Sequence, residues 1–193
     1  MSEVRMALVP ALEVLVALRR GQIVVTTMGA TREWARLSHD PLDFHYLPSA
    51  MGHAPLLGLG LALALPEREV IAFNGDGGML MGLGGLVTIA AARPANYTLV
   101  VLENGIYEVT GGQTTAGSGT VDFAAIGRAA GLTSVREFER LDDWRHAAPE
   151  CLALPSPRMI VLHVEPVGSD YQLPTLEPAA GRLERFRAAL AAG

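Results

Sequence analysis

Two strongly apolar runs, residues 69–74 and 97–102, restrict the folds that are open to this chain. Each run is short, continuous and rich in β-branched or aromatic residues, which is typical of strands that a parallel sheet buries on both faces. An apolar, helix-periodic segment at residues 79–92 separates them and predicts a crossover helix. The sequence therefore predicts a strand–helix–strand unit within a parallel sheet.

Polar residues follow both runs at the point where each strand ends. The first run leads into Gly75-Asp76-Gly77-Gly78, and the second leads into Asn104, 28 residues after Asp76. The carboxyl ends of parallel strands meet at one edge of the sheet, where ligands of such folds bind. Carboxylate and amide oxygens suit a hard divalent cation, and glycines let backbone amides approach a phosphate. This pattern predicts a diphosphate held through Mg²⁺.

Strands and helices alternate along the rest of the chain, which predicts a doubly wound α/β fold with a mostly parallel sheet and helices on both faces. We expect a single domain over residues 1–193, with a core at about 22–165 and a closing helix at about 181–191. Residues 27–31 predict a glycine-containing turn, residues 104–120 a long polar loop, and residues 165–178 an irregular segment, while Gly131 is expected to end the helix that begins at Phe123. The remaining expected helices lie at residues 7–19, 32–37, 52–65, 123–130 and 141–152, and the remaining strands at 22–26, 43–47, 134–137 and 158–164.

Composition excludes several classes of function. All 15 basic residues are arginine, so neither a lysine Schiff base nor a Walker-type phosphate loop can form. The net charge of −5 and the absence of a basic run argue against nucleic acid. The single cysteine, Cys151, excludes an intrachain disulfide framework. Half the residues are hydrophobic and only 18% are charged, which indicates either a sheet covered on both faces or an obligate interface.

The amino terminus lacks the basic-then-apolar pattern of a signal peptide, and the apolar run at residues 56–65 is too short to span a bilayer. We therefore expect a cytoplasmic protein with no membrane partner.

The spacing from Gly75-Asp76-Gly77 to Asn104 resembles the thiamine-diphosphate-binding motif. Three segments, residues 49–54 (SAMGHA), 74–81 (NGDGGMLM) and 103–113 (ENGIYEVTGGQ), are similar to the phosphonopyruvate and sulfopyruvate decarboxylases of that superfamily. The likeness extends over about residues 22–164. It implies a thiamine-diphosphate-dependent decarboxylase that acts on an acidic 3-substituted pyruvate and releases CO₂ and an aldehyde.

The resemblance also implies roles for individual residues. Asp76, the Asn104 side-chain oxygen and the Ile106 carbonyl would bind Mg²⁺. Met51 would support the bent cofactor from below, and the Ser49 carbonyl with the Met51 amide would bind its aminopyrimidine ring. The remaining residues implied in cofactor binding are Gly29, Ala30, Thr31, Gly75, Gly77, Gly78 and Tyr107.

One expected residue is missing. In this superfamily a glutamate on a separate pyrimidine-binding domain activates the cofactor, and no residue of this chain matches it. The resemblance therefore implies a split enzyme, a hetero-oligomer in which a pyrimidine-domain subunit completes the site for a small 2-oxo acid. No catalytic residue is assigned within this chain, although His53 is a candidate and is equally compatible with a structural role.

Three alternatives remain open from the sequence. A carboligase would use the same cofactor but is usually longer. A 2-oxo acid:ferredoxin oxidoreductase subunit is disfavoured because nearby cluster-binding cysteines are missing. A non-catalytic module that binds phosphate or nucleotide could use the same sheet edge. Taken singly, Asp76 could be a helix cap and Met51 core filling.

Overall fold

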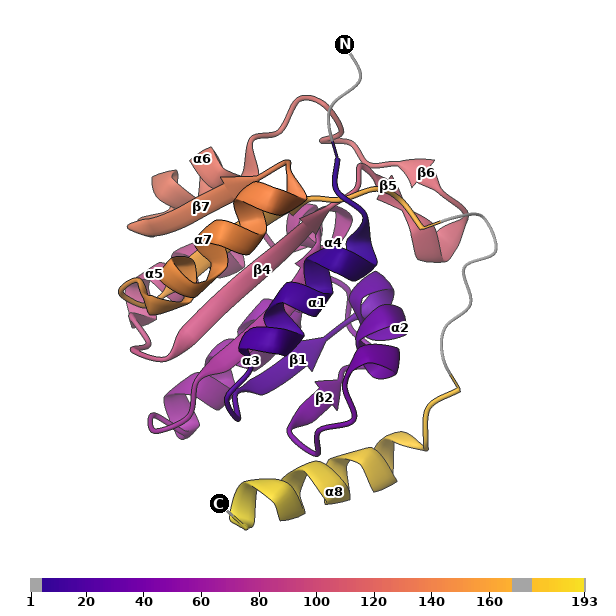
Figure 1. Cartoon of the computed structure of the whole chain (residues 1–193), viewed down its shortest axis with the longest axis vertical. Helices are drawn as coiled ribbons and strands as arrows, with labels where there is room; N and C mark the ends of the chain where they lie inside the picture. Colours follow the sequence, from indigo (N-terminus) through magenta and orange to yellow (C-terminus); the bar gives the residue numbers. More distant parts are fainter. Residues whose placement is uncertain (1–4, 168–174, 193) are drawn as a thin grey trace.

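The structure, a computed structural model, describes residues 5–167 and 175–192 (Figure 1). Within these residues, six parallel strands form the main sheet in the order β2-β1-β3-β4-β8-β7. In chain order they are β1 (Ile23–Thr26), β2 (Asp43–His45), β3 (Val70–Gly75), β4 (Tyr97–Glu103), β7 (Ser134–Phe138) and β8 (Arg158–His163).

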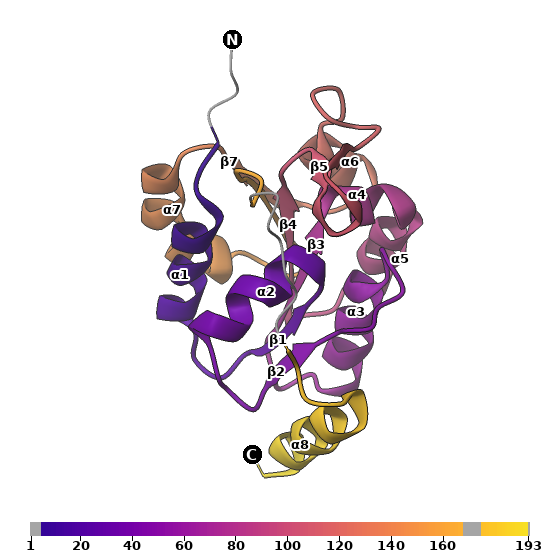
Figure 2. The same cartoon turned by 90° about the vertical axis from the view of Figure 1, so that its right-hand side faces the viewer.

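Helices cover both faces of this sheet (Figure 2). One face carries α1 (Leu8–Leu18), α2 (Met28–Leu37) and α7 (Leu141–Ala153), and the other carries α3 (Ala54–Ala64), α4 (Asp76–Met81), α5 (Gly84–Ala92) and α6 (Phe123–Ala129). The last helix, α8 (Ala179–Ala191), lies beside β2, where Phe186 packs on Phe44 with ring centroids 5.0 Å apart. The predicted doubly wound α/β fold is confirmed.

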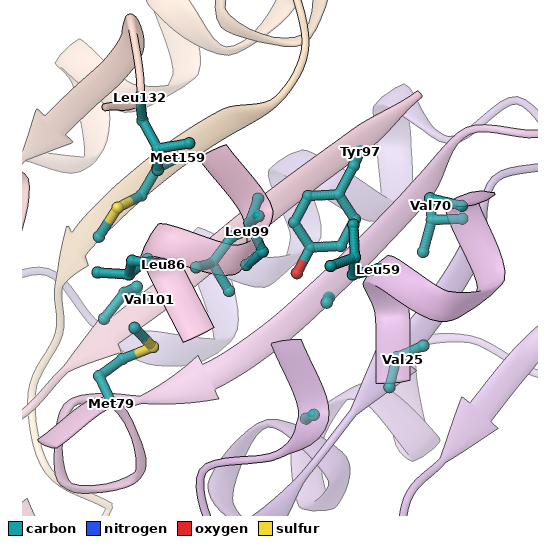
Figure 3. Close-up of a cluster of buried hydrophobic side chains, with 14 of the residues drawn as sticks. Val25, Leu59, Val70, Met79, Leu86, Tyr97, Leu99, Val101, Leu132 and Met159 are labelled. Carbon is teal, nitrogen blue, oxygen red and sulfur yellow. The ribbon is translucent and has the colours of Figure 1, made fainter. Parts of the chain in front are cut away.

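Each face of the sheet has its own apolar core because successive strand residues point to opposite sides. In the core drawn in Figure 3, Tyr97, Leu99 and Val101 of β4 pack beneath α3 and α5, and the Tyr97 hydroxyl donates to the Pro55 carbonyl at 2.9 Å. In the opposite core, Trp144 donates from its indole nitrogen to the Ala11 carbonyl at 3.0 Å. Both buried polar groups are thereby satisfied, and the two hydrogen bonds tie α3 to β4 and α7 to α1.

The chain changes direction across the sheet between β1 and β3. From β1 it passes into α2 on one face, whereas from β3 it passes into α4 on the opposite face. Loops that part in this way leave a crevice outside the carboxyl ends of the strands. β3 and β4 are adjacent, with Gly75 opposite Leu102, so Asp76 and Asn104 leave the sheet at nearly the same level.

Local structure departs from the sequence-based expectation in three places. The predicted turn at 27–31 is largely the first turn of α2, which begins at Met28 with a φ of 46°. The single helix predicted over 79–92 is two helices, because Gly82 packs so tightly that a Cβ there would lie 2.6 Å from the Gly52 carbonyl oxygen. The predicted loop after Asn104 contains a small antiparallel pair, β5 (Ile106–Tyr107) and β6 (Gln113–Thr114), joined by the 3₁₀ turn η1 (Glu108–Thr110).

Residues 168–174 of the segment expected to be irregular lie outside the described residues. Across residues 5–167 and 175–192, no helix combines the length and apolarity needed to cross a bilayer.

Candidate functional site

A pocket lies at the carboxyl edge of the sheet, where the segments that follow β1, β3 and β4 meet. Every residue predicted to bind the cofactor or metal lines this pocket except Thr31 and Ser49. Those that line it are Gly29, Ala30, Met51, Gly75, Asp76, Gly77, Gly78, Asn104, Ile106 and Tyr107.

Asp76 is the most deeply buried acid of the pocket, with 2% of its surface exposed. Its Oδ2 atom accepts hydrogen bonds from the Gly105 amide at 3.1 Å and from the Thr115 hydroxyl at 3.0 Å. Burial raises the pKa of the Asp76 carboxyl, while hydrogen bonds from Thr115 and from the Gly77 and Gly105 amides lower it. The site thus holds a desolvated carboxylate in a fixed orientation, which a divalent cation would stabilise in its charged form.

Asn104 and Ile106 form a tight turn directly after β4. The Ile106 amide donates to Asn104 Oδ1 at 3.0 Å, and the Asn104 side chain also hydrogen-bonds Glu108. Between them, Gly105 has a φ of +77°, a left-handed conformation, and a Cβ there would lie 2.7 Å from the Ser118 hydroxyl oxygen. This position therefore requires glycine, and the turn fixes Asn104 beside Asp76.

Glycines form the floor of the pocket because the backbone segments approach closely there. A Cβ on Gly78 would lie 2.6 Å from the Asn74 side-chain oxygen, and a Cβ on Gly77 would overlap the Tyr107 ring. Gly52 has a φ of +84°, and its Cβ would lie 2.8 Å from the Gly78 carbonyl oxygen. The segment that carries Met51 is therefore seated directly on the first turn of α4.

The charges that line the pocket constrain what it can bind. Asp76 and Glu108 are acidic, and the described residues of the lining include no arginine or histidine. The Glu108 carboxylate reaches the start of α2, where its Oε2 atom lies 2.9 Å from the position of a Cβ on Gly29. Burial raises the Glu108 pKa, and hydrogen bonds from Val167 and Asn104 lower it. A diphosphate could occupy such a pocket only together with a cation that offsets the two carboxylates.

The donor set suits Mg²⁺ better than a transition metal. Within residues 5–167 and 175–192, no three His, Cys, Asp or Glu side chains are grouped so that they could hold a metal ion. A cation at Asp76 would depend on the Asn104 oxygen and a backbone carbonyl as well, and oxygen ligands of this kind fit Mg²⁺.

Three predicted residues lie away from the pocket. The Thr31 side chain is buried and donates to the Thr26 hydroxyl at 2.9 Å. Ser49 is half-buried and its hydroxyl accepts from Thr27 at 3.3 Å. His53 is exposed, and its Nδ1 atom lies 3.1 Å from the Met51 carbonyl oxygen. Contacts from the Thr31 and Ser49 backbones, and a catalytic role for His53, stay predictions.

Sequence reasoning missed the contact between Thr115 and Asp76, which are 39 residues apart. No local pattern marks this threonine, because only the closure of the loop after Ile106 brings it to the carboxylate. It also missed Thr27 and Met28, which line the pocket from the end of β1. A positive φ at the non-glycine residue Met28 is the kind of local strain found at functional sites, but the sequence does not reveal it.

Comparison with known proteins confirms the predicted family. Residues 26–164 match the family described as "Thiamine pyrophosphate enzyme, C-terminal TPP binding domain". The chain is 40% identical over 191 residues to the phosphonopyruvate decarboxylase of Streptomyces viridochromogenes. The matched region covers 97% of this chain and 47% of that protein. It is 34% identical over 179 residues to the sulfopyruvate decarboxylase subunit beta of Methanothermobacter thermautotrophicus, with 92% of each chain covered.

Solved structures show the same fold. The benzoylformate decarboxylase of Polynucleobacter necessarius superposes with a TM-score of 0.64 at 22% identity, over 85% of this chain and 33% of that one. The chain thus spans about half the length of the phosphonopyruvate decarboxylase and about a third of this structural neighbour, but nearly all of the sulfopyruvate decarboxylase subunit beta.

Proposed function

Because the chain belongs to the thiamine pyrophosphate enzymes, as their C-terminal TPP-binding domain, we propose that it is the diphosphate-binding subunit of a split, Mg²⁺-dependent 2-oxo acid decarboxylase. The observation that carries this proposal is the pocket in which Asp76, Asn104 and Ile106 stand at adjacent strand ends over a floor of glycines. Sheet topology, buried carboxylate and oxygen donors all favour a metal-bound diphosphate there.

The residues of the pocket have distinct tasks in this proposal. Asp76, the Asn104 oxygen and the Ile106 carbonyl bind the cation. The backbone around Gly29 and Ala30 at the first turn of α2, and that of Gly77 and Gly78 at the first turn of α4, would approach the diphosphate, although the Gly77 amide also hydrogen-bonds the Asp76 carboxyl. When bound, thiamine diphosphate supplies the carbanion and the electron sink for decarboxylation. Met51, which lines the pocket, would support the bound cofactor.

The proposed substrate is an acidic 3-substituted pyruvate such as phosphonopyruvate or sulfopyruvate. Support comes from the names of relatives that are 34–40% identical to this chain. The pocket itself lacks a lining arginine or histidine among the described residues, so the acidic head of the substrate would depend on residues beyond this lining.

A partner subunit with a pyrimidine-binding domain is part of the proposal. The sulfopyruvate decarboxylase relative is named a beta subunit, and the phosphonopyruvate decarboxylase relative has about twice the length of this chain. Neither α3 nor α5 contains a charged residue, which is unusual for helices that face water. Leu63, Met81 and Val87, which we call the apolar face, are 54%, 55% and 58% exposed on α3, α4 and α5.

The apolar face suits the partner because it adjoins the pocket. The first turn of α4 lines the pocket and its last residue is Met81, while α3 starts two residues after Gly52. Both helices form the outer layer on one side of the sheet (Figure 2). A domain that covered this layer would lie beside the pocket, where the missing glutamate is needed.

Calorimetry with thiamine diphosphate and Mg²⁺ tests the cofactor assignment. We expect binding that requires both components and that Asp76→Ala abolishes. Binding of a nucleotide but not of thiamine diphosphate, with or without a partner, would refute the assignment and favour a non-catalytic phosphate-binding module.

Co-expression with a candidate partner tests the split-enzyme proposal. Decarboxylation of a panel of 2-oxo acids should require both chains, and Val87→Asp should prevent co-purification. The matched control is Val9→Asp on α1, which is 36% exposed on the opposite face of the sheet and should leave the complex intact. Ordinary enzymatic turnover by this chain alone would contradict the need for a partner.

A further inference from the structure

Thr115 is buried within a loop whose neighbouring residues face water. Only 3% of its surface is exposed, whereas Thr114 and Ala116 on either side are exposed. Its amide donates to the Gly105 carbonyl at 2.9 Å, which anchors the far end of the loop to the turn after β4. The hydroxyl then points at Asp76, so both the backbone and the side chain of Thr115 contact the same small region.

Two donors meet at one oxygen of Asp76. The Gly105 amide and the Thr115 hydroxyl lie 3.1 Å and 3.0 Å from Oδ2. The terminal torsion of an aspartate is broad, so a carboxylate that is held by one donor can still rotate. The Gly77 amide also hydrogen-bonds this carboxyl, and the two loop donors restrict its rotation further because both contact Oδ2 and neither contacts Oδ1.

We propose that Thr115 is a positioning residue for the divalent cation, because it holds Asp76 Oδ2 and so presents Oδ1 to the metal. This inference rests on the proposed function, since it assigns to Thr115 a task at the same Mg²⁺ site. Residues that orient a metal ligand commonly change metal affinity by 10–100-fold when they are removed. Threonine suits the task because its β-branched side chain has few rotamers, so its hydroxyl direction is well defined.

The inference also links the loop to the cation. Thr114 is the last residue of β6, which pairs with Ile106 of β5, and Thr115 follows directly. In the structure, the hydroxyl reaches Asp76 with this pairing and the Gly105 contact both in place. Cation binding and closure of the loop favour each other by the same hydrogen bond.

The test measures cation affinity in four variants of the full chain, with its partner present if the wild type requires one. Mg²⁺ is titrated by calorimetry at saturating thiamine diphosphate, and Mn²⁺ is titrated by electron paramagnetic resonance as a direct count of bound metal. Thr115→Val removes the hydroxyl donor and keeps the shape of the side chain, and Thr115→Ala leaves room for a water. Thr115→Ser keeps the donor. Thr120→Val is the control. Thr120 is exposed in the same loop, and its hydroxyl contacts the Gly117 carbonyl.

We expect the Kd for the cation to rise about 10–100-fold in Thr115→Val, less in Thr115→Ala, and only by about threefold or less in Thr115→Ser. Thr120→Val should bind as the wild type does. Equal affinity in Thr115→Val and the wild type would overturn the inference. If Thr115→Val does not fold, the comparison of Ala with Ser decides, because equal affinities in these two would also overturn it. Failure of the wild type to bind the cation and thiamine diphosphate would instead refute the proposed function.

Discussion

Glu103 provides a test of the electrostatics beside the pocket. It is the last residue of β4 and only 6% exposed, and no hydrogen-bond donor among the described residues reaches its Oε2 atom. The His163 Nδ1 atom lies 3.7 Å from that oxygen. Burial raises the pKa of Glu103 from 4.5 to about 6, against the opposing influence of His163.

The sign and size of the effect on stability follow from this shift. A folded-state pKa above the unfolded value means that protonation favours the folded protein. The contribution is fully present below pH 4.5 and is lost as the pH rises through about 6. At about 1.4 kcal/mol for each unit of pKa, the ionised carboxylate costs the folded state about 2 kcal/mol above that pH.

Glu103→Gln removes this dependence because glutamine does not ionise. Any change in packing from the substitution affects all pH values alike, so the pH dependence is the readout. We expect the free energy of unfolding of Glu103→Gln, relative to the wild type, to be about 2 kcal/mol higher at pH 7.5 than at pH 4.5. Urea denaturation at both pH values, followed by fluorescence of the buried Trp34 and Trp144, measures it.

Glu137→Gln is the matched control. Glu137 contacts the other ring nitrogen of the same histidine at 2.9 Å, but its side chain is 36% exposed. For Glu137→Gln, the free energy of unfolding relative to the wild type should not rise in the same way between pH 4.5 and pH 7.5. The free energy of unfolding of Glu103→Gln relative to the wild type could instead stay constant or fall between pH 4.5 and pH 7.5. That result would show that the carboxylate is well solvated, and the reasoning about its burial would be wrong.

Four further substitutions test the scaffold. Gly52→Ala should lower the free energy of unfolding by about 2 kcal/mol or more, because Gly52 has a φ of +84° and a Cβ would clash with the Gly78 carbonyl. As a control, Gly60→Ala on α3, where a Cβ would meet no other atom, should raise the free energy of unfolding by about 0.5–1 kcal/mol. Asp43→Ala should cost up to about 3 kcal/mol in urea denaturation, because the buried Arg19 side chain loses its carboxylate at 2.6 Å and keeps only the more distant Asp40 at 3.5 Å. Asp122→Ala should cost about 1 kcal/mol, or about 2–4 °C in Tm, by removal of the α6 cap; an unchanged Tm would refute that role.

The sequence predicts the sheet well because its central strands are buried on both faces and read as continuous apolar runs. The runs at 69–74 and 97–102 correspond to β3 and β4 within one residue at either end. The same logic places Asp76 and Asn104 at one edge, since two adjacent parallel strands leave little freedom in where their ends lie. Gly131, with a φ of +107°, follows α6 as the expected stop signal.

What the sequence does not predict depends on contacts between distant segments. The break between α4 and α5 arises because Gly82 meets the Gly52 backbone, and neither residue signals this contact locally. The same is true of Thr115, whose role depends on closure of a loop that reads as polar and irregular. The start of α2 at Met28 was also not predicted, because Gly29 within residues 27–31 indicates a turn in the sequence.

The apolar face has a consequence for how such a protein is produced. A subunit without its partner exposes the uncharged helices to water. Exposed apolar surface of this kind favours association with any similar surface. An unpaired copy is therefore expected to aggregate or to be degraded, whereas an assembled copy is protected. Under the proposed function, the supply of the two subunits has to be balanced, and the amount of active enzyme is set by whichever subunit is scarcer.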